Sequence, residues 1–417
     1  MRFKPQLVIA VWLLCQFQPQ IAWGQTERAA SFDQILSWAV VKSPKLSEAD
    51  SKVRSKHAIV EGKIAQRYPT FSATTNALNN TGGSSVTLKA NMPVWSFGKV
   101  DASIDLASAE MAYEVAGRAL VKNNVLSEAA QTYVDIYYIQ EKVKVAKLNV
   151  IEHESILKRI QRQRRAGAVG EADVRTAQSR LLSAKNQVNS LEGELIGLRD
   201  ELRVITDSAD ISQVSEIPFS WLMQQRGLIN LEQLINKNPE VSRTQAEIKV
   251  AELRLLVAAR EGYPNVYLDV ERDLGKSNAA YRNRVGLKMD VAIKGAGVVN
   301  DASLREAEEL LEAVKASGHT VRNQIARDFK SWAASSAELE SIIRSQSEVV
   351  VSLEETVRSA LRRLDGGRMS WIEVLNFQRE LNEARIQLLQ YQGNWTSRIM
   401  SMVNLGGLLE SRLKVPA

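Results

Sequence analysis

The chain has 417 residues, with 54 Lys or Arg against 48 Asp or Glu, which gives a formal charge of +6 at pH 7. These charges are interspersed along the expected helices, which indicates solvated helix faces rather than a nucleic-acid-binding patch. The only cysteine is Cys15, inside the leader described next, so we expect neither disulfides nor thiol chemistry in the mature protein.

Residues 1–24 have the features of a secretory signal peptide. Arg2 and Lys4 give a positive start, residues 7–15 form an apolar run, and small residues precede Gln25. This run is too short to span a membrane, and the alternative interpretation is a disordered apolar N-terminus. Because no later stretch reaches about 18 consecutive apolar residues, we expect no transmembrane helix.

The first of two repeats spans residues 25–228. A predicted capping box at Ser31 opens a short helix, and Pro44 interrupts it. A longer helix then runs to the Tyr-Pro dipeptide at 68–69, where the periodicity changes from helical to alternating. The remaining predicted elements are, in order, a β-hairpin (about 70–94), a long helical hairpin (98–207) and an equatorial segment (208–228).

The same pattern recurs in residues 229–417. Pro44 and Pro69 have counterparts at Pro239 and Pro264, each 195 positions later. The predicted elements are a helix, a β-hairpin (about 265–293), a long helical hairpin (298–407) and a C-terminal tail. Identities in the returning helices lie 200 positions apart: Gly167/Gly367, Val174/Val374, Gln178/Gln378, Leu181/Leu381, Ala184/Ala384 and Gln187/Gln387. Chance matching between helices rich in Ala and Gln is the alternative.

The predicted strands alternate between apolar and polar residues. We expect one side of the last strand to face lipid, and this side holds Val285, Leu287, Met289, Val291 and Ile293. Strands of about ten residues suit a tilted bilayer crossing. Open sheet edges do not persist in hydrocarbon, and bacterial membrane barrels begin at about eight strands, so several chains must contribute.

The number of chains follows from the barrel interior. Two chains would give eight strands with a filled interior, and three would give twelve with room for an aqueous passage. Each long helix would reach about 100 Å if continuous. The helices would therefore extend the barrel as a tube.

Several motifs occur in a duplicated order: SPKL (43–46) and NPEV (238–241), the two Tyr-Pro dipeptides, MPVWSFGK (92–99), GAVGEADVRTAQ (167–178) and GRMSWIEVLNFQ (367–378). On these motifs, the chain resembles the TolC family of outer-membrane efflux and secretion conduits over essentially its whole mature length.

This resemblance implies a mainly α fold with a transmembrane β portion. It also implies a homotrimer with a twelve-stranded β-barrel, a periplasmic α-helical barrel and an equatorial girdle, here around 209–225. The implied function is the outer-membrane exit duct of a tripartite efflux pump or type I secretion system. A periplasmic adaptor and an inner-membrane pump or ABC transporter are the implied partners, together with outer-membrane lipid, and no cofactor is implied.

The resemblance also suggests which residues form the periplasmic gate. Relatives often line the closed mouth with carboxylates just after the second glycine turn. Here Glu373 occupies the first such position and Asn376 the second, so a single acidic ring is expected. Arg368 lies about one residue from where some relatives place a gate-locking arginine, and Asp365 ends the preceding helix. A solvated or helix-capping charge is the alternative for each residue.

The two glycine turns are the expected adaptor-contact surface. The residues concerned are Gly167, Val169, Gly170, Asp173, Gly366 and Gly367. The basic run at 162–165 precedes the first turn. At a helix C-terminus such a run favours compensation of the helix dipole, or an adaptor contact, over a site for anionic ligands.

No pattern in the sequence indicates an enzyme. His57, His153 and His319 lie on separate helical segments without metal-ligand spacing, so no metal site is expected. The rival hypothesis from another class is a soluble periplasmic coiled-coil adaptor or scaffold. It accounts for the helices and glycine turns, but it leaves two alternating hairpins without a covering core.

Overall fold

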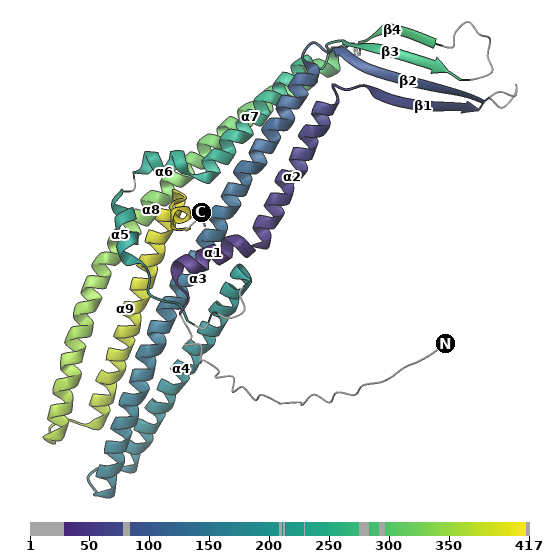
Figure 1. Ribbon diagram of the computed structural model, residues 1–417. Helices are drawn as coiled ribbons and strands as arrows, with labels where there is room; N and C mark the ends of the chain where they lie inside the picture. Colours follow the sequence, from purple (N-terminus) through teal and green to yellow (C-terminus); the bar gives the residue numbers. More distant parts are fainter. Residues whose placement is uncertain are drawn as a thin grey trace, which may run out of the picture.

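A computed structural model of the chain describes residues 29–77, 84–207, 211, 213–228, 230–274, 283–291 and 297–413. The predicted signal peptide, the tips of both β-hairpins and Ile293 lie outside these residues. The described part is a rod of helices with a β-sheet at one end and two helix turns at the other (Figure 1).

Two very long helices run the length of the rod. They are α3 (Lys99–Arg165) and α8 (Val298–Asp365), with 67 and 68 residues, or about 100 Å each. Near the sheet they pack with α2 (Pro44–Ala65) and α7 (Pro239–Arg260). Toward the other end α3 packs with α4 (Glu171–Thr206) and α8 with α9 (Trp371–Leu405). The two repeats therefore contribute equivalent helices to each half.

The helix starts follow local capping chemistry. Ser31 forms the predicted capping box with Gln34 at the start of α1 (Phe32–Lys42). The equivalent α6 (Leu231–Lys237) has a simpler cap, in which the Asn230 side chain accepts a bond from the Glu232 backbone N–H at 2.9 Å. Pro44 and Pro239 are the first residues of α2 and α7, a position where a missing N–H costs no helical bond.

The four strands form one antiparallel sheet in the order β1-β2-β3-β4. They are β1 (Thr70–Ala77), β2 (Ser84–Trp95), β3 (Asn265–Asp273) and β4 (Asn283–Asp290). The hairpins of the two repeats thus join through β2 and β3. The simple alternation along β2 ends at an irregularity between Pro93 and Trp95, which leaves Val94 without a cross-strand partner and sets Trp95 opposite Val266.

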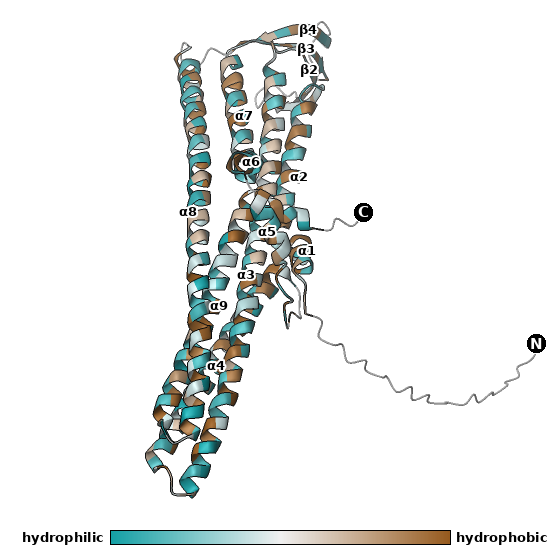
Figure 2. Ribbon diagram, turned by 90° about the vertical axis from the view of Figure 1, so that its left-hand side faces the viewer, coloured by the Kyte–Doolittle hydropathy of each residue, from teal (hydrophilic) through white to brown (hydrophobic). Residues whose placement is uncertain are grey.

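The helices carry polar and apolar residues along their whole length (Figure 2). Within the described ranges, none of them is long and apolar enough to cross a membrane. The largest apolar core lies midway along the rod, where α1, α3, α4, α5 (Phe219–Leu228), α9 and η3 (Leu408–Arg412) meet. A smaller core lies beneath the two helix turns, around Ile160, Trp371 and Leu375.

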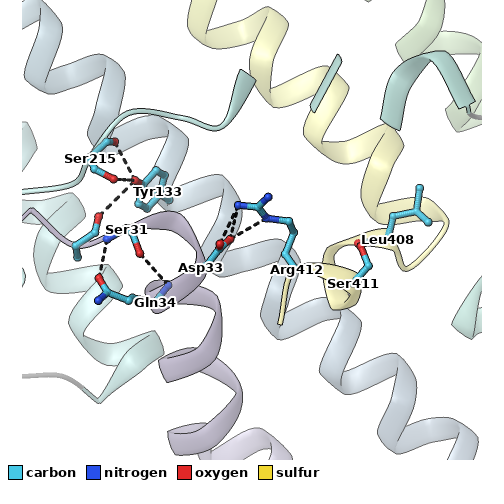
Figure 3. A network of polar contacts seen from close by, with 9 residues as sticks. Ser31, Asp33, Gln34, Tyr133, Ser215, Leu408, Ser411 and Arg412 are labelled. Atoms are coloured by element: carbon cyan, nitrogen blue, oxygen red, sulfur yellow. Dashed lines mark hydrogen bonds and ion pairs between the residues drawn. The ribbon is translucent and has the colours of Figure 1, made fainter. Parts of the chain in front are cut away.

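A polar network joins α1, α3 and η3 beside the central core (Figure 3). The Tyr133 hydroxyl donates to the Ser215 carbonyl at 2.8 Å. Arg412 donates from Nε and Nη2 to the two carboxylate oxygens of Asp33, both at 2.8 Å, and its guanidinium lies 5.1 Å from the Trp221 ring centroid. The Arg412 guanidinium, with its two hydrogen bonds to Asp33 (the Asp33–Arg412 fork), therefore connects α1, α5 and η3.

Arg412→Ala should loosen this junction, because it leaves the half-buried Asp33 carboxylate unpaired. We expect the local opening free energy of α1 and residues 408–413 to fall by about 1–2 kcal/mol. Hydrogen exchange of the purified protein, followed by mass spectrometry, measures this loss. Arg322→Ala, at an exposed site on α8, is the control and should leave α1 protected. Equal protection of α1 in both variants would contradict the role of the fork.

Candidate functional site

The cross-strand register gives the sheet one continuous apolar face. Paired residues project to the same side of a sheet, so the pairs can be followed across all four strands. One row runs from Phe71 through Ala90 and Val270 to Val285, and the next holds Met92, Leu268 and Leu287. Toward the helices the face continues with Trp95, Val266 and Met289.

The opposite face carries charged residues that are largely paired. Glu271 contacts Lys89 at 3.6 Å and Arg284 at 3.0 Å, and Lys288 contacts Asp290 at 3.0 Å. Because neighbouring strands contribute opposite charges, this face suits contact with water. The sheet therefore has one side suited to lipid and one suited to a solvated lumen.

The predicted lipid-facing residues of β4 lie on or directly after an exposed edge strand. Val285, Leu287 and Met289 belong to the apolar face, with 72%, 73% and 63% of their surface exposed. Val291 follows the strand and is 52% exposed. Lys288 is also exposed within a single chain, so exposure alone does not separate the two faces of β4. The cross-strand register separates the two faces of β4. It also places Leu287 and Val285 nearer the middle of the apolar face than Met289.

Residues of β1 and β3 complete the apolar face, although their alternation is weak in the sequence. On the side of β1 that holds Phe71, the next two alternate positions are Ala73 and Thr75. On the side of β3 that holds Val270, the next alternate position is Arg272. Pairing with β2 is what assigns Phe71 and Val270 to the apolar face. Aligning the two strands of each β-hairpin could have predicted this assignment. The pattern of one strand alone does not contain that information.

Aromatic side chains gather where the sheet joins the helices. Tyr68, Tyr263, Trp95 and Phe97 are all exposed there, and the Trp95 and Phe97 rings meet edge-to-face at 5.9 Å between centroids. At the opposite end of the apolar face lies Arg272, paired with Leu88 and exposed. An apolar band with aromatic residues at its border is the pattern of membrane-embedded sheets.

The sheet has two open edges in a single chain. In the described structure β1 pairs with β2 alone and β4 with β3 alone. Each edge strand therefore presents backbone N–H and C=O groups on one side without strand partners.

At the far end of the rod, the two helix turns have the same backbone geometry. Gly167 and Gly367 adopt φ of +75° and +68°, a left-handed conformation that favours glycine. In each turn the residue after this glycine donates its N–H to a carbonyl five positions earlier, Gln163 or Arg363, at 2.9 Å. Gly170 and Gly366 have negative φ, so only one glycine per turn is required by conformation. Val169 packs against the core below the turns.

Two of the predicted acidic residues cap helices within the chain. Glu373 accepts from the Ser370 backbone N–H at 2.9 Å and from its hydroxyl at 2.8 Å, and these bonds hold the pKa of the Glu373 carboxyl below its usual value. Asp173 accepts from the Gly170 N–H at 3.2 Å. Both carboxylates can still carry their negative charge at the tip.

The other predicted gate residues lie at or between the two helical hairpins. Asp365 forms an ion pair with Arg159 of α3. Asn376 accepts a long hydrogen bond of 3.4 Å from Arg180 of α4. Arg368 is exposed just after the second turn. The structure therefore brings Asp365, Arg368 and Glu373 to one turn, with Asn376 about one helical turn further along α9.

Polar contacts between the hairpins were missed by sequence reasoning. Gln378 of α9 is buried and donates to Glu152 of α3, whose pKa is raised by burial despite the attraction of Arg385. Asn382 donates to Gln187 at 2.9 Å. The duplicated glutamines at 178 and 378 were the available signal, because a polar residue in a helix seam often has a polar partner opposite.

Gly367→Ala should destabilise the second turn, since an alanine there must adopt a left-handed conformation that costs about 1 kcal/mol. A methyl group would meet no atom within 4 Å, so strain alone is tested. Gly366→Ala is the matched control, with ordinary contacts and negative φ. We expect faster proteolysis of this turn only in the first variant. Equal cleavage rates would contradict the conformational requirement.

Comparisons with known proteins agree with these features. The family model described as "Outer membrane efflux protein" matches residues 35–206. The pyoverdine export outer membrane protein OpmQ of Pseudomonas aeruginosa is 25% identical over 420 residues, covering 92% of this chain and 85% of that protein. Nodulation protein T of Rhizobium leguminosarum bv. viciae is 22% identical, covering 88% and 80%.

Solved structures show the same fold. CusC matches with a TM-score of 0.80 and 19% identity, covering 94% of this chain and 95% of the other. The open state of the MtrE outer membrane channel of Neisseria gonorrhoeae matches with a TM-score of 0.77 and 17% identity, covering 92% and 91%. The mainly helical fold predicted from the sequence is confirmed. Residues 35–206 match the outer membrane efflux protein family, and the relatives and solved structures together indicate an outer-membrane channel with a periplasmic helical domain rather than an enzyme.

Proposed function

We propose that three copies of this chain form the exit duct through which a periplasmic adaptor and an inner-membrane pump or ABC transporter release cargo across the outer membrane. The observation that carries this proposal is the single sheet with one apolar face, one charged face and two open edges. Such a sheet is stable in lipid only when every edge is paired.

Closure by three chains meets this requirement. The β4 edge of one chain would pair with the β1 edge of the next, so three sheets of four strands make a twelve-stranded barrel. Its apolar face would contact lipid and its charged face would line an aqueous lumen. Two chains would close a barrel whose interior side chains fill it, and a filled barrel does not suit an exit duct.

The helices would continue this barrel into the periplasm. Both α3 and α8 leave the sheet end of the rod and reach the glycine turns at its far end (Figure 1). The turns around Gly167, Gly170 and Gly367 would contact the adaptor. Glu373, Arg368, Asn376 and Asp365 would form the constriction at the periplasmic mouth, and the ion pair from Asp365 to Arg159 would hold the two hairpins of one chain together.

The border residues set the depth of the barrel in the membrane. Tyr68, Tyr263 and Trp95 would lie at the periplasmic interface, where aromatic rings are favoured. Arg272 would lie at the outer interface. The scaffold hypothesis is not favoured, because it gives the apolar face of the sheet no lipid to contact and leaves both edges bare.

Leu287→Arg should impair assembly, because it places a charge in the middle of the lipid-facing side. The expected cost is about 2–4 kcal/mol for a site near the bilayer midplane. Lys288→Arg, one residue further on the charged face, is the matched control and should be nearly silent. The yield of outer-membrane trimers on semi-native gels measures both. Equal tolerance of the two changes would contradict the assignment of the faces.

Cysteines on the two edge strands should crosslink neighbouring chains. The chain has no cysteine outside the predicted signal peptide, so pairs that combine residue 71, 73 or 75 with residue 285, 287 or 289 can be scanned. At least one pair should give a covalent ladder that ends at three chains. Pairs that combine residue 73 with residue 268, on the interior strand β3, are the control and should give no ladder. A ladder that ends at two chains would refute the trimer.

A further inference from the structure

The two helix-turn tips contain the whole basic excess of the chain. Residues 158–180 and 358–380 hold twelve Lys or Arg and five Asp or Glu, a net charge of +7, whereas the entire chain carries +6. The remaining 371 residues therefore have a net charge of −1. Charges of both signs occur along the helices, but the basic excess is concentrated at the tips.

Most carboxylates at the tips are already engaged. Asp173 and Glu373 cap helix starts, and Asp365 is ion-paired across the hairpins, as described above. Glu171 forms an ion pair with Arg164. Each of these carboxylates therefore has a local partner, and its charge is already included in the net +7 of the tips.

Six exposed cations at the tips have no hydrogen-bonded or ion-paired side-chain partner within the described ranges. They are Lys158, Arg162, Arg165, Arg358, Arg362 and Arg368.

Four of these cations form a duplicated stripe. Lys158 and Arg162 lie four residues apart on α3, and Arg358 and Arg362 occupy the equivalent positions, 200 residues later, on α8. Like charges at this spacing destabilise a helix. Two copies of such a pair, without carboxylate partners, therefore point to a role outside the folding of the helices.

Compensation of the helix dipole does not account for this charge. The dipole places about half a negative charge at a helix C-terminus, and its effect fades within the last turn. Lys158 and Arg358 lie seven residues before the ends of α3 and α8, about two turns away. The charge at the tips exceeds the dipole in both size and extent.

We infer that the periplasmic mouth of this duct is an anion-attracting entrance and that its cargo is negatively charged. This inference rests on the proposed trimer, in which six basic stripes would surround the mouth. The twelve positive charges of these stripes would exceed the three negative charges of the Glu373 carboxylates there. A Debye length of about 8 Å at physiological salt is somewhat shorter than the diameter of a helix, about 10–12 Å, so each stripe acts mainly on the solution that it faces and more weakly across a one-helix wall.

A field of this kind concentrates counter-ions. Clefts lined by one sign of charge raise the local concentration of opposite charges by about tenfold or more. Anionic cargo would therefore be enriched at the entrance and cationic solutes would be depleted. Among the described residues of the sheet, the charges on the polar face are paired and create no comparable field, so the preference would be set at the mouth.

Planar-bilayer recordings of the purified full-length trimer test this inference. In a KCl gradient the reversal potential should show chloride preferred over potassium, and the preference should shrink in 1 M salt, where the Debye length falls to about 3 Å. The variant K158Q/R162Q/R358Q/R362Q should lower the chloride-to-potassium permeability ratio severalfold. Release of the polyanionic dye calcein from proteoliposomes should slow in the same variant.

The double variant R358Q/R362Q has a charge-matched control on the same helix. R322Q/K330Q removes two exposed cations about 50 Å further from the tip and should leave selectivity unchanged. A wild-type channel that prefers potassium would overturn the inference, as would equal ratios in the tip and control variants. Tip variants that keep their selectivity but lose crosslinking to the adaptor would assign the stripes to protein docking instead. Trimers without conductance would overturn the proposed duct itself.

Discussion

The fold depends on one constraint, the need to pair the backbone groups at the two edges of a four-stranded sheet. A soluble sheet can leave its edge to water, but a sheet whose face is apolar across four strands has no such option in lipid. Among the described residues of a single chain, neither edge of this sheet has a second strand partner. The proposed trimer satisfies this constraint by closing the sheets into a barrel, and the long helices would then be arranged in a ring below it.

The helical rod connects the sheet to the glycine turns at the opposite end, and three sets of contacts hold it together. Near the sheet, Glu110 of α3 contacts Lys56 of α2 at 2.8 Å and Arg254 of α7 at 3.2 Å, which joins the two repeats. The central core and the Asp33–Arg412 fork fix the middle. Below it, the hairpins meet through polar pairs such as Asn382 with Gln187 and through the smaller apolar core beneath the two turns.

Charge is organised differently at the two ends of the molecule. On the polar face of the sheet each cation has a carboxylate near it on the same or a neighbouring strand, as with Glu271 between Lys89 and Arg284. At the tips six cations have no such partner in the part of the chain that the structure describes. Paired charges keep a lumen hydrated without a strong field, whereas unpaired charges of one sign create a field that extends about a Debye length into solution. From this difference we expect the entrance to select solutes by charge and the lumen of the barrel not to do so.

The sequence by itself determined the element order and the duplication, because capping residues, prolines and glycines act locally. Ser31, Pro44 and the left-handed Gly167 and Gly367 need only their own neighbours to start or end a helix. Tertiary structure decided what depends on pairing between distant segments. The register across β2 and β3 assigned Phe71 and Val270 to the apolar face and left Val94 unpaired, and it set Leu287 rather than Met289 near the middle. Packing of α3 beside α8 and α9 likewise decided that Asp365 meets Arg159 and that Glu152 meets Gln378. Local propensity contains no information about these partners, since a cross-strand or interhelical contact is fixed only when the two segments pack together.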